Sequence, residues 1–162
     1  MGLVDTLFTA PGALLRALSA IVEDDRQRRR LSGVHFASGV IIRGADRIRV
    51  GRNVFLDHRA YLNCNPSPEG NSYITLGDNV EIGPYTVIWG GGGVEIGSNV
   101  HMGAHVHVTS IQGARIPVTR LDPAEGIEIN RRPVKIGDHV LIFSGAVIVP
   151  GVTIGHHSMI AA

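Results

Sequence analysis

The fold is decided by residues 133–160, whose sequence is PVKIGDHVLIFSGAVIVPGVTIGHHSMI. An aliphatic residue returns at every sixth position of this stretch, at Ile136, Ile142, Ile148, Ile154 and Ile160. A second small or branched residue stands two positions before each of them, and a spacing of two places both side chains on one face of a strand. Each hexapeptide is therefore a short strand followed by a turn, and only a neighbouring coil can cover its inward face.

The six-residue period extends backward through the chain to Phe36 and Ile42 and restarts after insertions. Extra residues follow Leu62, Ile88 and Val108, each of which is the third aliphatic residue of its run. If three hexapeptides form one coil, all of these insertions leave from the same corner of a triangular prism. The remaining inward positions are also aliphatic: Val50, Leu56, Leu76, Ile82, Ile96, Met102 and Ile142. The sequence predicts an all-β, parallel β-helix.

Glycine follows the aliphatic residue at five turns, and Asn or His stands two residues after each glycine. Gly and Asn tolerate positive φ best. We therefore expect these residues to adopt left-handed conformations at tight corners. The glycines are Gly51, Gly77, Gly97, Gly137 and Gly155, and the residues after them are Asn53, Asn79, Asn99, His139 and His157.

The N-terminal part of the chain has a different pattern, since residues 3–30 carry apolar residues at helical spacing and end in a basic run. We predict an N-terminal α-helix, with residues 1–33 forming a helical cap over the open end of the β-helix. Residues 34–162 then form the hexapeptide-repeat β-helix, from which a loop at 109–133 protrudes. Contact of the helix with a membrane surface is the alternative.

Composition excludes several classes of function. The formal net charge is +1, so the chain lacks the strong positive electrostatic potential that would attract nucleic acid. Cys64 is the single cysteine, which leaves no internal disulfide and no Cys-x-x-Cys zinc motif. The N-terminus lacks the pattern of a signal peptide, and no stretch has the ~20 apolar residues that a membrane span requires. A cytoplasmic protein is expected.

Four phrases of the sequence carry a resemblance to a known family: residues 76–79, 89–97, 132–138 and 147–155, the last being VIVPGVTIG. Together with the repeat, they resemble the hexapeptide-repeat acyltransferases, in particular the sugar O-acetyltransferases related to maltose and galactoside acetyltransferase. The resemblance implies a left-handed β-helix, a homotrimer and active sites between subunits. It also implies acetyl-CoA as the acyl donor and a sugar or polysaccharide-precursor hydroxyl as the acceptor.

Acyl transfer to a hydroxyl requires a general base, and histidine suits this role near neutral pH. The family's histidine corresponds to Gly113, and residues 109–133 contain no histidine. His107 is therefore the first candidate base and His105 the second, because both precede the insertion. Ser144 and Ala162 match family positions that line the pantetheine channel. The insertion has a slightly basic balance that could meet CoA phosphates, with Arg115, Arg120, Arg131 and Arg132 against Asp122, Glu125 and Glu128.

Two other functions stay open at this point. The absent loop histidine is compatible with a catalytically degenerate trimeric scaffold of the same family. His101, His105 and His107 lie close together in sequence, as a carbonic-anhydrase-like metalloprotein would need, but they do not reproduce that family's ligand spacing, and no metal is expected. Relatives continue with a further coil beyond the position of Ala162, so the sequence is either a fragment or lacks part of the CoA site.

Overall fold

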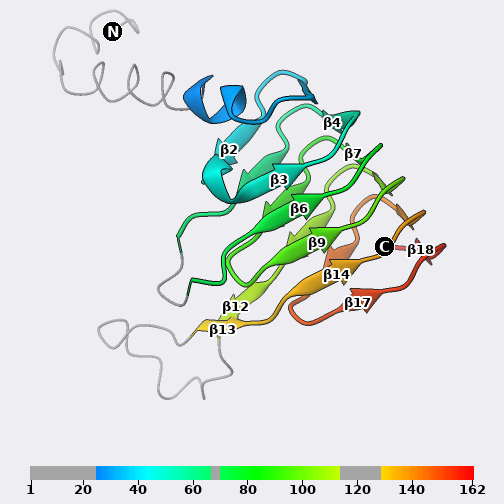
Figure 1. The fold of residues 1–162 in the computed structure, drawn as a ribbon. Helices are drawn as coiled ribbons and strands as arrows, with labels where there is room; N and C mark the ends of the chain where they lie inside the picture. The colour runs from blue at the N-terminus through cyan, green and yellow to red at the C-terminus, as the bar shows by residue number, and fades with distance from the viewer. Residues whose placement is uncertain (1–24, 67–69, 114–128) are drawn as a thin grey trace, which may run out of the picture.

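The computed structural model describes residues 25–66, 70–113 and 129–162. Three parallel sheets wind around one axis, and each coil contributes one strand to each sheet, which forms a left-handed parallel β-helix (Figure 1). Sheet A contains β1 (Val34–Phe36), β4 (Val54–Leu56), β7 (Glu81–Ile82), β10 (His101–Met102), β15 (Leu141–Ile142) and β18 (Met159–Ile160). Sheet B contains β2 (Ile41–Arg43), β5 (Tyr61–Asn63), β8 (Val87–Trp89), β11 (His107–Thr109) and β16 (Val147–Ile148). Sheet C contains β3 (Ile48–Val50), β6 (Ile74–Leu76), β9 (Val94–Ile96), β14 (Val134–Ile136) and β17 (Thr153–Ile154).

The predicted inward positions form the core. Met102 pairs in register with Ile82 on one side and with Ile142 on the other, so the three side chains lie one above another. All three are completely buried. Val50 and Ile160 are partly buried and pack against the same core. The six-residue period therefore predicted the core correctly, because each inward side chain meets its equivalent in the next coil.

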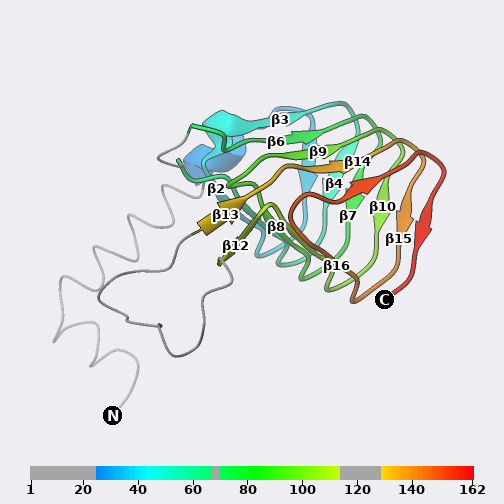
Figure 2. The same cartoon turned by 90° about the horizontal axis from the view of Figure 1, so that it is seen from below.

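The insertions leave from one corner, as the repeat count predicted. Those after β5, β8 and β11 each connect a strand of sheet B to a strand of sheet C. The longest begins and ends in two antiparallel strands, β12 (Ile111–Gly113) and β13 (Ile129–Arg131), which form a stalk projecting from the column (Figure 2). Residues 114–128 between them, and with them Arg115, Arg120, Asp122, Glu125 and Glu128, lie outside the described residues.

The corner glycines have a different role from the one predicted. The Asn and His residues at these corners do adopt positive φ, for example 55° at Asn79 and 57° at Asn99. Gly77 and Gly97 do not. A Cβ on Gly77 would instead lie 2.7 Å from the carbonyl carbon of Gly97 in the next coil. These glycines are needed because successive coils approach too closely for a side chain, and not because of their own φ.

Residues 25–29 form a helical turn beside the first coil. The Gln27 side-chain oxygen accepts the Ala45 N–H at 2.8 Å, and the Arg28 guanidinium donates to the Val40 carbonyl. The rest of the helix predicted for residues 3–30 lies outside the described residues. Within the described part of the chain, no helix has the length and hydrophobicity needed to span a membrane.

The glycine contacts predict a position-dependent effect of one methyl group. Gly77→Ala should lower the free energy of unfolding by about 1–3 kcal/mol, because the new Cβ overlaps the backbone of the next coil. Gly155→Ala is the matched control, since the nearest atom to its Cβ is 3.9 Å away and alanine reduces the freedom of the unfolded chain. Urea denaturation of both variants checks this, and equal losses of stability would contradict it.

Candidate functional site

The turns between sheets A and B form an exposed edge, here named the A–B edge, which holds both predicted donor-binding residues. The Ser144 hydroxyl accepts the backbone N–H of Ala104 in the preceding coil at 3.0 Å. The pairing of Ile142 with Ile160 places Ala162 at the equivalent position of the following coil. Ser144 and Ala162 are both exposed. Small side chains therefore follow one another along this edge and leave its surface open to an extended ligand.

The backbone N–H of Ser144 is available for binding. The equivalent N–H of Ala104 uses the Ser144 hydroxyl, but the residue that follows Ser144 in the column is Ala162, whose side chain has no acceptor. Among the described residues, no hydrogen-bond acceptor lies opposite this N–H. A backbone donor of this kind can stabilise an oxyanion. Sequence reasoning missed it, because it depends on which residues stack across coils.

His105 lies at the same edge, in a turn and not on a strand face. Its φ is 56°, and its ring stacks on that of Tyr85 with centroids 5.0 Å apart and planes inclined by 5°. The Arg59 guanidinium lies over the other end of this stack, 5.7 Å from the Tyr85 ring centroid. The sequence placed His105 before the insertion, and the structure adds that it takes the left-handed conformation of a turn residue. Its ring remains exposed.

His107 lies on β11, the strand that leads into the long insertion. It points outward from sheet B, where its neighbours in the adjacent strands are Val87 and Val147. Its side chain is exposed, and within the described ranges no carboxylate pairs with it. An imidazole on an apolar surface beside the insertion can exchange a proton with a bound hydroxyl.

The three neighbouring histidines do not converge. His101 points outward from sheet A, and its Nδ1 lies 2.9 Å from the Glu81 carboxylate. His105 occupies the A–B edge and His107 the face of sheet B. No group of three or more His, Cys, Asp or Glu side chains that could hold a metal ion occurs among residues 25–66, 70–113 and 129–162.

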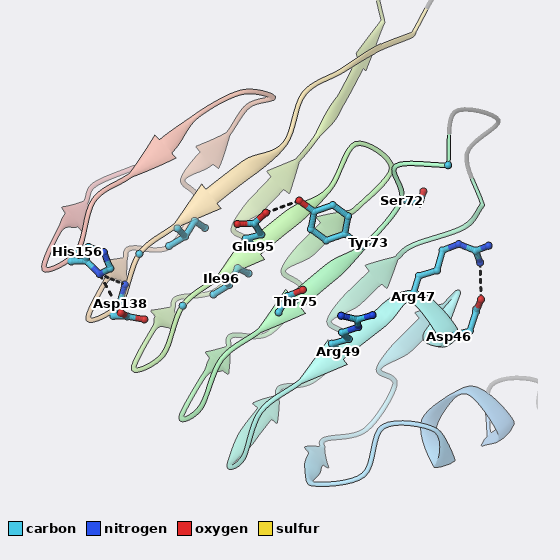
Figure 3. A pocket seen from close by; sticks show the side chains of 14 residues that line it. Asp46, Arg47, Arg49, Ser72, Tyr73, Thr75, Glu95, Ile96, Asp138 and His156 are labelled. Carbon is cyan, nitrogen blue, oxygen red and sulfur yellow. Dashed lines mark hydrogen bonds and ion pairs between the residues drawn. The ribbon is translucent and has the colours of Figure 1, made fainter.

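A groove of about 800 Å³ runs over the outer face of sheet C (Figure 3). At its centre the Tyr73 hydroxyl donates to the Glu95 carboxylate at 2.6 Å, and the Lys135 ammonium lies 3.3 Å from the same carboxylate. The hydrogen bond to Glu95 raises the pKa of Tyr73 to about 12. In turn, Tyr73 and then Lys135 lower the pKa of Glu95. These residues were not among the candidates from the sequence, because Tyr73 lies in an insertion whose path no repeat count gives.

Comparison with known protein families finds two matches in the repeat region. Residues 133–162 match the bacterial transferase hexapeptide (six repeats), and residues 73–110 match the hexapeptide repeat of succinyl-transferase. The sequence is 42% identical over 91 residues to YJL218W of Saccharomyces cerevisiae, a candidate acetyltransferase. That match covers 56% of this chain and 44% of YJL218W, so the chain spans less than half of that relative.

Two further proteins match over more of the chain. Nodulation protein L of Rhizobium meliloti is 29% identical over 148 residues, which is 89% of this chain and 68% of that protein. Among solved structures, the N-acyltransferase AntD from Bacillus cereus superposes with a TM-score of 0.64 at 21% identity, covering 85% of this chain and 77% of AntD. That AntD variant was solved with dTDP-4-amino-4,6-dideoxyglucose and coenzyme A. At this identity the superposition shows a shared fold.

The contact between Tyr73 and Glu95 predicts an unusual tyrosine titration. Since the raised pKa favours the protonated phenol in the folded state, one of the three tyrosines should ionise near pH 12. This contact stabilises the fold fully below the unfolded pKa of 10, and the contribution is lost as pH rises from there through 12. Glu95→Gln should lower the midpoint, measured by absorbance at 295 nm with Tyr73→Phe to assign the transition. An unchanged midpoint would refute the contact.

Proposed function

We propose that this chain, whose repeats match hexapeptide transferase families over residues 73–110 and 133–162, transfers an acyl group from acyl-CoA, with acetyl-CoA as the donor, to a hydroxyl of a sugar or polysaccharide precursor. Three similarities support this proposal: the transferase repeats in the middle and the C-terminal part of the β-helix, the identity with an acetyltransferase-like yeast protein, and the fold shared with AntD. AntD binds coenzyme A and an amino-sugar nucleotide, so an amine acceptor is the competing chemistry.

The observation that carries the proposal is the exposed A–B edge, where the Ser144 N–H has no partner among the described residues. A pantetheine arm lying along the column of Ala104, Ser144 and Ala162 would bring the thioester to this donor. The acceptor oxygen attacks the thioester carbonyl as a base removes its proton, and the Ser144 N–H stabilises the resulting oxyanion. The carbon–sulfur bond then breaks, and the CoA thiolate leaves and takes a proton from the protonated base.

His107 is the base in this proposal and His105 its alternative. His107 stands on the outer face of sheet B, between the A–B edge and the corner from which the insertion leaves. His105 directly follows Ala104, whose N–H bonds to the Ser144 hydroxyl, but its ring is stacked on that of Tyr85. The ring of His107 has no such partner among the described residues, so it is better placed to turn toward an acceptor.

A homotrimer that buries sheet B would complete the site. The outer face of this sheet carries exposed apolar side chains at Ile41 and Val147, which are 40% and 61% exposed, and Val149 directly after β16 is 46% exposed. Isolated exposed aliphatic residues are ordinary, but several on one sheet face support a contact surface. Association through sheet B would surround His107 with a second subunit, so that acceptor and donor meet between chains.

Donor binding and turnover test the function. We expect calorimetry to detect acetyl-CoA binding to the purified protein, and transfer to a sugar hydroxyl to release free CoA. His107→Ala should lower turnover by a factor of ~10² without abolishing acetyl-CoA binding. His35→Ala, an exposed histidine on β1, is the control and should leave turnover unchanged.

Each alternative has its own outcome in the same measurements. Absence of acetyl-CoA binding at millimolar concentration would identify a non-catalytic scaffold, which the lack of a histidine in residues 109–133 favours. Transfer to amino sugars alone would replace the hydroxyl acceptor by an amine. Full turnover of His107→Ala would shift the role of base to His105, and His105→Ala tests that directly.

The assembly has a separate test. Light scattering after size-exclusion chromatography should give three times the 17.3 kDa mass of the chain. Val147→Lys should dissociate this trimer, because it would bury a charge in an apolar contact. Thr153→Lys is the matched control, since it lies outward on sheet C and should remain trimeric. A monomeric wild type, or an intact Val147→Lys trimer, would exclude sheet B as the contact face.

A further inference from the structure

The groove on sheet C is built from residues of different coils that the stacking places in one row. Arg49, Thr75 and Glu95 occupy equivalent outward positions on β3, β6 and β9, paired directly from strand to strand. Adjacent parallel strands lie ~4.8 Å apart, so Arg49 and Glu95 are separated by about 10 Å at their backbones. This row is long enough for a single sugar ring with one substituent.

Tyr73 forms the wall of the groove and is held in place from two sides. Its hydroxyl donates to Glu95, and its ring lies against the backbone at Gly93, where a Cβ would come within 2.6 Å of a ring carbon. Only glycine leaves room for the ring there, and the φ of Gly93 is +93°. The aromatic wall and the carboxylate are thus positioned before any ligand binds.

The centre of the groove can exchange hydrogen bonds with hydroxyl groups. The Glu95 carboxylate contacts both Tyr73 and Lys135, yet 41% of its side-chain surface is exposed, so it can accept further hydrogen bonds. Thr75 beside it offers both a donor and an acceptor. A mixture of fixed donors and acceptors around an aromatic ring suits a polyhydroxylated molecule better than an apolar one.

One end of the groove carries an excess of positive charge. Arg47 and Arg49 both line this end, and Asp46 is the single acidic residue among its lining side chains there (Figure 3). The Asp46 carboxylate lies 2.7 Å from the Arg47 guanidinium. Arg49 is exposed and forms no ion pair with the other described residues. Guanidinium groups bind phosphate and carboxylate through paired hydrogen bonds.

We propose that the sheet C groove binds a monosaccharide carrying one anionic group, with the anion at Arg47 and Arg49 and the ring hydroxyls at Thr75, Tyr73 and Glu95. The shared chemistry covers sugar phosphates and uronic acids. This site lies on a different face from the A–B edge and from the apolar face of sheet B. It goes beyond acyl transfer, since binding here requires neither acetyl-CoA nor a catalytic base.

Calorimetric titration of the full chain, without acetyl-CoA, tests the site. The probes are the 1-phosphates of glucose, galactose and N-acetylglucosamine, and glucuronate, with neutral glucose and inorganic phosphate as references. We expect at least one anionic sugar to bind at least tenfold more tightly than both references. Preference for the phosphates or for glucuronate then identifies the source of the anion.

Variants locate the binding. Arg49→Gln should weaken the anionic sugar at least tenfold, Arg49→Lys less, and Tyr73→Phe severalfold. Arg52→Gln is the matched control, because Arg52 pairs with Asp78 outside the groove and should leave affinity unchanged. Equal binding of inorganic phosphate, equal effects at Arg49 and Arg52, or no binding of any probe at millimolar concentration would each overturn the proposal. None of these results would bear on acyl transfer.

Discussion

Every coil of this protein is held to the coils on either side by main-chain hydrogen bonds in strict register. Met102, paired with both Ile82 and Ile142, is typical of the whole column. Because parallel pairing stacks equivalent positions, each residue must suit the same position of the next coil. The aliphatic core, the Asn79–Asn99 side-chain bond of 3.0 Å and the stacked rings of the corner histidines all follow from this constraint. At Gly77 the backbones of successive coils lie so close together that only glycine fits at this position.

The same constraint leaves the outward positions free to differ between sheets. Two side chains of each hexapeptide are committed to the interior, and the alternation of a strand directs the intervening one outward. Sheet B uses these positions for Ile41 and Val147, whereas sheet C uses them for Glu95 and Lys135. One backbone therefore presents a largely apolar face, a charged face and, between sheets A and B, an edge that holds both a column of small residues and the stacked rings of Tyr85 and His105.

Stacking also brings functional groups together across long stretches of chain. Ala104 and Ser144 meet through a hydrogen bond although 40 residues separate them. Glu95 and Lys135 have the same separation, because the long insertion lies between their coils. Insertions at one corner can thus lengthen without disturbing the column, while the residues before and after them remain adjacent. This arrangement allows a rigid scaffold to carry variable segments beside fixed chemical groups.

The sequence by itself determined the β-helix, its inward residues and the common corner of its insertions, since a period of six can be counted along the chain. It also indicated that His107 is exposed beside the long insertion. Only the tertiary structure decided that His105 lies in a turn against Tyr85, that the Ser144 N–H finds no partner in the described part of the chain, and that Tyr73 contacts Glu95. The physical reason is that a repeat specifies which side chains face inward, whereas the contacts of turns, insertions and outward side chains depend on which atoms of neighbouring coils approach one another.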